Sequence, residues 1–271
     1  MTGESAPRGA AGSASPPTAG SAVSPPVHSG QTRVLDHLVY ATPELAATVE
    51  EFAERTGVRP APGGVHPGLG TRNHLVDLGE GRYLEIIGPD PEAPEPRRPR
   101  PFGIDELTGP RLVTWALCPV DLDATVGGAR SAGYDPGPVV PMSRTTAEGA
   151  TLNWRLAGLT GQEPPGLVPF LIDWGTSPHP TSAPGLPRLT LEGLQLHAMA
   201  PGLTLGRLSA LGALTVPEES AAGATTGVAA TGVATTGPVL VEVFAVAGEE
   251  GPRENRLECT LTTPRGILTF G

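Results

Sequence analysis

The sequence predicts an α+β fold that is built from tandem β-α-β-β-β units. Two observations support this fold class. Residues 34–90 combine short apolar stretches of period two with one amphipathic helical pattern, which is the order of elements in such a unit. Residues 111–175 repeat this order after a proline-rich linker at 91–110. We therefore expect residues 34–180 to form one domain with two internal repeats.

The first unit is expected to begin with a strand at Leu35–Ala41, which is apolar and too short for a typical helix. The helix that follows has Thr42 as its expected N-cap, and Gly57 ends it. The segment 58–73 is expected to be a loop or an irregular second strand, because its glycines permit close backbone approach. Two strands joined by a tight turn close the unit, at Asn73–Gly79 and Arg82–Gly88.

The second unit is expected to contain a strand that begins at Arg111, a helix at about 120–132 and a loop at 141–149. Its last two strands are predicted at Ala150–Gly158 and Leu167–Gly175. The linker 91–110 is expected to cross the surface in an extended form, because proline favours that conformation.

Two regions are expected to lie outside this repeat. Residues 1–33 hold almost no large apolar side chain, so they predict a disordered tail. Residues 189–271 resemble a degenerate third βαββ unit that packs on the sheet and completes it. The low-complexity stretch 221–237 within this unit predicts a disordered insertion.

The composition excludes several classes of function. Acidic residues outnumber basic ones by 28 to 18, for a net charge of -10, which argues against nucleic acid or an anionic membrane as partner. All 18 basic residues are Arg, so lysine chemistry is excluded. Cys118 and Cys259 belong to no CxxC pair. The sequence shows neither a membrane span nor a secretion signal, and we expect a cytoplasmic protein.

Two polar side chains interrupt apolar strands of the first unit. On the strand Leu35–Ala41, His37 shares a face with Leu35 and Val39. On the strand Arg82–Gly88, Glu85 shares a face with Tyr83 and Ile87. An imidazole and a carboxylate in these positions are costly to bury without partners. A shared metal ion or a polar ligand would supply one.

Three stretches of the first unit carry a resemblance to a known family. They are the Asp36-His37 pair on the first strand, HPGLGTRNHLV at His66–Val76, and YLEIIGPDP at Tyr83–Pro91. In these stretches the chain resembles the vicinal oxygen chelate superfamily, and in particular its glyoxalase-like branch. The resemblance covers roughly residues 34–180.

The resemblance implies the cup-shaped mixed sheet of the glyoxalase, bleomycin-resistance and dioxygenase-like fold. It also implies a divalent metal such as Zn, Fe, Mn or Ni, with His37 and Glu85 at the two positions that supply ligands from one unit. In the second unit, alignment places Thr114 and Ile172 at these positions, so that unit has lost the ligand-type residues. The third ligand would be His66, His74, His197 or Asp173.

Further residues are expected around the cup as contacts of a small molecule. His66 is either a turn histidine or a group at the mouth of the cup, and Asn73 is a polar contact. Ser143 and Arg144 either belong to a surface loop or face the cup, where they would bind an anionic or carbonyl group, since arginine offers a planar fork of donors. Trp154 is either a core residue or part of the rim of a pocket.

Three functions remain open from the sequence. The first is a metal-dependent lyase, isomerase or dioxygenase-type enzyme that acts on a small carbonyl compound, with Glu85 moving a proton. The second is a metal-free, resistance-type protein that binds a small molecule. The third is a structural domain with a vestigial site. A monomer and a homodimer are equally compatible with two units in one chain.

Overall fold

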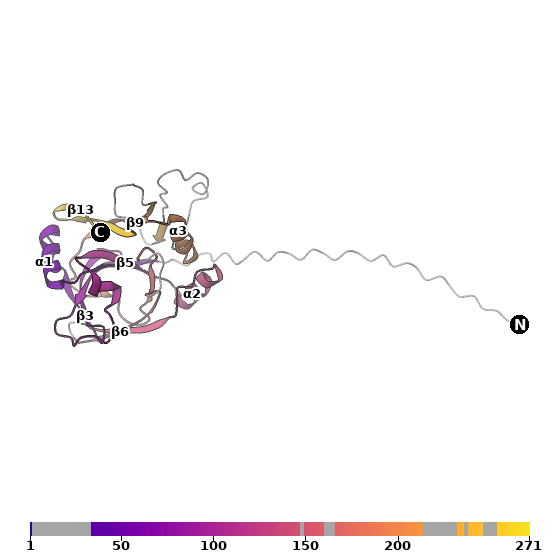
Figure 1. Cartoon of the computed structure of the whole chain (residues 1–271), viewed down its shortest axis with the longest axis horizontal. Coiled ribbons are helices and arrows are strands. Elements are labelled where there is room, and N and C mark those ends of the chain that lie inside the picture. The colour runs from indigo at the N-terminus through magenta and orange to yellow at the C-terminus, as the bar shows by residue number, and fades with distance from the viewer. Residues whose placement is uncertain (2–33, 147–148, 160–165, 214–231, 236–237, 246–253) are drawn as a thin grey trace. The chain divides into compact units, whose positions relative to one another are not determined.

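A computed structural model describes Met1 and residues 34–146, 149–159, 166–213, 232–235, 238–245 and 254–271 (Figure 1). Eight strands form a closed barrel in the order β1-β4-β3-β2-β6-β7-β8-β5. The expected α+β fold with a cup-shaped mixed sheet is confirmed, and the pairing of β2 with β6 closes the sheet. The predicted tail at 1–33 falls almost entirely outside the described residues.

The barrel consists of two halves with the same connectivity. In each half the first and last strands pair in parallel, and the halves meet where β1 pairs with β5 and β2 with β6. The first half contains β1 (Val34–Ala41), β2 (Ala61–His66), β3 (Thr71–Gly79) and β4 (Arg82–Pro89). The second half contains β5 (Arg111–Cys118), β6 (Val140–Thr146), β7 (Thr151–Ala157) and β8 (Phe170–Asp173).

One helix follows the first strand of each half. Helix α1 (Leu45–Thr56) ends at Gly57 in the left-handed conformation, as predicted. Its N-cap is Glu44 and not Thr42, whose hydroxyl instead accepts a hydrogen bond from the Glu44 amide. Helix α2 (Leu122–Ser131) is capped by the Asp121 side chain. No helix in the described parts of the chain has the length and apolarity needed to cross a membrane.

Two connecting segments differ from the expected loops. The segment expected as a loop at 141–149 contains the barrel strand β6, whose Arg144 pairs with Leu152 of β7. The linker 91–110 is not extended throughout, because Pro101–Glu106 form a 3-10 helix. Phe102 of this helix has a φ of 63°, in the left-handed region that non-glycine residues rarely adopt.

The C-terminal region forms a second sheet, so the expectation that it completes the first one is wrong. Its five strands lie in the order β10-β11-β9-β12-β13. They are β9 (Thr190–Ala198), β10 (Gly232–Thr235), β11 (Pro238–Ala245), β12 (Arg256–Thr263) and β13 (Gly266–Phe270). Helix α3 (Pro201–Ala210) follows β9. Of the stretch 221–237, the structure describes only β10.

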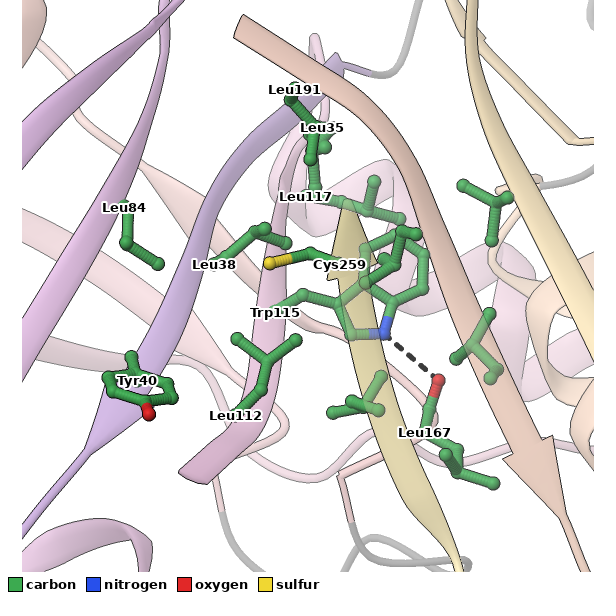
Figure 2. Packing of buried hydrophobic residues seen from close by; sticks show 14 of the residues in the cluster. Leu35, Leu38, Tyr40, Leu84, Leu112, Trp115, Leu117, Leu167, Leu191 and Cys259 are labelled. Carbon is green, nitrogen blue, oxygen red and sulfur yellow. Dashed lines mark hydrogen bonds between the residues drawn. The ribbon is translucent and has the colours of Figure 1, made fainter. Parts of the chain in front are cut away.

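The second sheet packs on the outer face of the barrel beside β5 (Figure 1). One apolar cluster joins the two, and Figure 2 shows Leu38, Leu117 and Cys259 gathered around Trp115. The indole of Trp115 donates a hydrogen bond to the Leu167 carbonyl oxygen, so this buried ring leaves no unpaired donor. A separate apolar cluster lines the inside of the barrel.

An irregularity in β1 positions its polar residues. The pairing of β1 with β5 shifts between Leu35 and His37, which leaves Asp36 as an extra residue in a β-bulge. A bulge breaks the alternation of side chains along a strand. As a result, both Asp36 and His37 contact groups on the inner side of the barrel.

Candidate functional site

A cavity of about 580 Å³, with its open mouth included, lies inside the barrel. Five polar or charged side chains line it: His37, His66, Asn73, Glu85 and Arg144. The remaining lining residues are apolar or aromatic: Leu69, Leu75, Tyr83, Ile87, Pro101, Phe102, Met142, Trp154, Leu156, Leu159, Phe170, Ile172 and Trp174. A mostly apolar hollow with a few convergent polar groups is typical of a small-molecule site.

Glu85 on β4 is the centre of the polar groups. Its Oε1 accepts a hydrogen bond of 2.5 Å from the side-chain amide of Asn73. The Nε2 atoms of His37 and His66 each lie 3.9 Å from one of its two carboxylate oxygens. Because these three neighbours come from β3, β1 and β2, every strand of the first half contributes to this group.

Asp36 contacts the ring nitrogen of His37 that faces away from Glu85. Its Oδ1 lies 2.5 Å from His37 Nδ1, while its Oδ2 accepts hydrogen bonds from Trp174 Nε1 at 3.0 Å and His179 Nε2 at 3.2 Å. Burial by itself would raise the pKa of Asp36, but the combined interactions with His179 and His37 outweigh burial and hold the pKa at about 2. Asp36 is therefore ionised at neutral pH.

These contacts determine the position of the ring protons. His179 Nδ1 accepts the backbone N–H of Thr181, so its Nε2 carries the hydrogen that it donates to Asp36. An ionised carboxylate only accepts, so Nδ1 of His37 also carries a hydrogen. The neutral tautomer with this hydrogen on Nδ1 leaves Nε2 as an acceptor, 3.9 Å from Glu85 Oε2.

His66 at the end of β2 is a second imidazole in the cavity. Its Nδ1 lies 3.1 Å from the Thr71 hydroxyl. Burial lowers its pKa, and the nearby charge of Glu85 opposes this effect only in part. His66 is thus neutral at physiological pH. It lies at the turn between β2 and β3, and its side chain lines the cavity.

Arg144 reaches the polar groups across a pair of glycines in β2. Its side chain is buried, with 5% exposed, and its Nη1 donates a hydrogen bond to the Gly63 carbonyl oxygen. A Cβ on Gly64 would lie 2.7 Å from Arg144 Nη1, and one on Gly63 would lie 2.3 Å from Asn73 Oδ1. The glycine pair therefore makes the space that both polar side chains occupy.

Aromatic rings form most of the remaining wall. Tyr83 stacks on His37 with ring centroids 4.6 Å apart, and Phe170 meets the His37 ring edge-on at 5.3 Å. Trp154 and Trp174 pack against each other at 5.4 Å. Burial raises the pKa of Tyr83 well above its usual value, so its phenol stays neutral. These rings provide an apolar surface beside the charged groups.

The family of the protein follows from a comparison of its sequence with known families. The profile of the family described as a glyoxalase-like domain matches residues 35–212, which is more than half of the 271 residues. The chain belongs to the glyoxalase-like domain family. The resemblance to the vicinal oxygen chelate superfamily is confirmed with it. No curated protein sequence matches the chain significantly.

Solved structures support the fold of this glyoxalase-like protein. A hypothetical protein from Staphylococcus aureus is similar with a TM-score of 0.62 at 13% identity, and the match covers 88% of this chain and 99% of that chain. Methylmalonyl-CoA epimerase from Mycobacterium tuberculosis matches with a TM-score of 0.35 at 17% identity, over 55% of this chain and 92% of its own. The epimerase from Streptomyces coelicolor, in complex with 2-nitronate-propionyl-CoA, matches at 0.36 and 20%, over 54% and 97%. Only the first supports a statement about this chain, and that statement concerns the fold.

Most of the predicted site residues of this glyoxalase-like domain come together in the cavity. His37, Glu85, Asn73 and Arg144 line it, and Trp154 belongs to its wall. Ser143 does not, because side chains alternate along β6, and Ser143 is exposed to solvent between Met142 and Arg144. Its predicted place in the cup is therefore wrong.

Of the four alternatives for a third metal ligand, only His66 lines the cavity. His74 is on the opposite face of β3 from Asn73, His197 contacts Glu258 in the second sheet, and Asp173 pairs with Arg155. The positions aligned with His37 and Glu85 in the second half hold Thr114, which does not line the cavity, and the apolar Ile172.

The side chains of the site are of the types that bind a divalent metal, but they are not arranged to hold one. His37, His66 and Glu85 offer two imidazoles and a carboxylate, which zinc and iron accept. Among the residues described, however, no group of three His, Cys, Asp or Glu side chains is arranged to hold a metal ion. The site in this conformation therefore does not fit the metal that the family implies, and we derive no step through it.

Proposed function

We propose that this glyoxalase-like protein is an isomerase- or lyase-type enzyme that moves a proton next to the carbonyl group of a small molecule. The observation that carries this proposal is the Glu85 carboxylate, which lies in the cavity with an imidazole Nε2 at 3.9 Å from each of its oxygens. A buried carboxylate next to a second acceptor is well placed to take a proton from a bound substrate.

The neighbouring groups have separate roles in this proposal. Glu85 accepts the proton from the carbon beside the carbonyl, and the electron pair of the broken C–H bond moves onto the carbonyl oxygen. Arg144 donates hydrogen bonds to the oxygen that becomes negative. His37, held by Asp36, keeps its Nε2 as an acceptor 3.9 Å from Glu85 and shares the transferred proton. The apolar wall excludes water, which strengthens these interactions.

Exchange of substrate C–H hydrogens with solvent deuterium tests the proposal. A panel of small aryl ketones and 2-oxo acids is incubated with the protein in D₂O and followed by proton NMR. We expect enzyme-dependent exchange in at least one compound and a loss of roughly 10²- to 10⁴-fold in Glu85→Gln.

The matched control is Asp173→Asn, which removes a carboxylate that does not line the cavity, on the corresponding strand of the second half. It should leave the exchange rate unchanged. If no compound exchanged, or if Glu85→Gln exchanged as fast as the native protein, the proposal would be rejected.

A metal-dependent enzyme is a second candidate, and one observation favours it. The nitrogen of each imidazole that faces away from Glu85 is already bonded, to Asp36 in one case and to Thr71 in the other. Such outer partners orient metal-binding histidines. Elemental analysis of protein purified without chelators decides this candidate: stoichiometric metal that is lost in His37→Ala supports it, and metal-free protein rejects it.

Binding without chemistry is a third candidate, favoured by the predominantly apolar wall of the cavity. A protein with this function would be stabilised by small hydrophobic molecules in a thermal-shift screen and would exchange none of their hydrogens. If neither stabilisation nor exchange occurred with any compound, a structural domain with a vestigial site would be the remaining interpretation.

A further inference from the structure

The buried charge of Arg144 indicates the chemical class of the ligand that the cavity binds. Building on the proposed function of the cavity, we infer that the ligand is a small carboxylic acid with an aromatic or branched hydrocarbon body. Arg144, whose guanidinium has five N–H donors, binds its carboxylate as well as the oxygen that becomes negative. Three features of the described residues support this inference: the unpaired charge, the absence of further cations along the cavity, and the position of the apolar wall.

The charge of Arg144 lacks a counter-ion. Its side chain is 5% exposed and forms one hydrogen bond, to the carbonyl oxygen of Gly63. No carboxylate of the described residues lies within the 4.0 Å of an ion pair with it. A guanidinium has five N–H donors and stays protonated, and a buried charge without a partner is costly. A neutral carbonyl would accept a hydrogen bond but leave the charge, whereas an anion supplies both.

The anion is a carboxylate rather than a phosphate. Arg144 is the sole arginine among the described residues that line the cavity, and the sequence has no lysine. The planar fork of one guanidinium matches the two oxygens of one carboxylate. A phosphate group would bring more negative charge close to Glu85, with no second cation to balance it.

The apolar wall begins next to Arg144. Met142 precedes it by two residues on β6 and faces the same side, at a separation of roughly 7 Å given the rise of a strand. Trp154 is the cross-strand partner of Met142, and Trp174 packs on Trp154. A molecule whose carboxylate contacts Arg144 therefore places its hydrocarbon body against these side chains.

Binding of a matched set of probes tests this inference. The probes are 3-phenylpropionate, its neutral amide 3-phenylpropionamide, and propionate, measured by titration calorimetry with the full-length protein. We expect 3-phenylpropionate to bind about ten- to a hundred-fold more tightly than the amide, because the charged contact is lost in the amide. Propionate should bind more weakly than 3-phenylpropionate, because it lacks the aromatic body.

Substitutions test whether Arg144 causes the preference for the acid over the amide. Arg144→Met should bind acid and amide equally, and Arg144→Lys, which keeps the charge, should retain part of the preference for the acid. Arg98→Met removes an exposed arginine that does not line the cavity and should bind like the native protein. Equal binding of acid and amide by the native protein, an unchanged preference in Arg144→Met, or no binding of any probe would overturn the inference.

The outcome can be separated from that of the proposed function. Glu85→Gln should keep the preference for 3-phenylpropionate while losing deuterium exchange. Preference for the acid without exchange in any compound would reject the proposed function alone. Exchange in neutral ketones without a preference for the acid would reject the ligand class alone.

Discussion

The two halves of the barrel share one connectivity but contribute differently to the cavity. The first half supplies His37, His66, Asn73 and Glu85, whereas the second supplies Arg144 and mostly apolar side chains such as Trp154 and Ile172. Each half pairs its first and last strands in parallel. The repeated topology therefore determines the shape of the hollow, and single side chains at equivalent positions determine its chemistry.

This asymmetry separates two tasks. The first half concentrates acceptors around one carboxylate, which is the arrangement that proton transfer requires. The second half offers a cation and an apolar wall, which is the arrangement that holds an amphipathic molecule. The two halves contact each other at Gly63 and Gly64 of β2, against which the side chain of Arg144 from the second half packs. The predictions below test this division, starting with the largest expected effect.

Gly63→Ala tests the contact between the halves. The new Cβ would lie 2.3 Å from Asn73 Oδ1 and 2.8 Å from Leu75 Cγ, so both side chains must move. We expect the free energy of unfolding to fall by up to about 3 kcal/mol, and Asn73 to lose its hydrogen bond with Glu85. Urea denaturation measures the first effect, and deuterium exchange measures the second.

The control is Gly127→Ala in α2, where nothing lies within 4 Å of the added Cβ. It should leave stability unchanged or raise it by up to about 1 kcal/mol, since alanine favours a helix. Equal effects of the two substitutions would show that the glycine at position 63 does not position the polar groups.

Asp36→Asn tests whether the carboxylate behind His37 stabilises the first half. The folded pKa of Asp36, about 2, lies below its ordinary value of 3.8, so its contribution is present above about pH 4 and is lost as the pH falls towards 2. The shift corresponds to about 2 kcal/mol at pH 7. Urea denaturation at pH 7 and pH 3 should show a difference between native and variant protein that shrinks at the lower pH.

The comparison for this prediction comes from the second half. Asp173 pairs with Arg155 at the surface, and exposed ion pairs contribute little. Asp173→Asn should therefore cost under about 1 kcal/mol. If Asp36→Asn were no more destabilising than Asp173→Asn at pH 7, the network around Asp36 would have no role in stability.

The sequence predicted most of the individual strands and helices of the barrel, but not the strand pairing that closes it. Strands such as Leu35–Ala41 and the end of α1 at Gly57 follow from local periodicity and capping, which short stretches encode. The pairing of β2 with β6 and the separate second sheet depend on contacts between residues far apart in sequence. Local patterns do not encode such contacts.

Local sequence patterns also predicted some residues of the candidate site and missed others. His37 and Glu85 were predicted because they interrupt apolar strands, and both line the cavity. Asp36 was missed as a partner of His37, because regular alternation would place it on the other face and the bulge in β1 changes that. Phe102 was missed because its linker showed no signal apart from proline, although the 3-10 helix brings it to the cavity.

Trp174→Phe tests whether the second half also supports the acid–base groups of the first. Trp174, which follows β8, donates a hydrogen bond of 3.0 Å from its indole N–H to Asp36 Oδ2. A phenyl ring at this position would remove that hydrogen bond. Trp154→Phe is the matched control, because its ring packs on Trp174 without a hydrogen bond of its own in the described structure. Both substitutions replace an indole by a phenyl ring, so the hydrogen bond to Asp36 is the main difference between them. We expect Trp174→Phe to be less stable by about 1 kcal/mol in urea denaturation at pH 7 and to raise the pKa of Asp36. Equal losses would restrict the second half to binding the ligand and would make the proton-transfer groups a property of the first half alone.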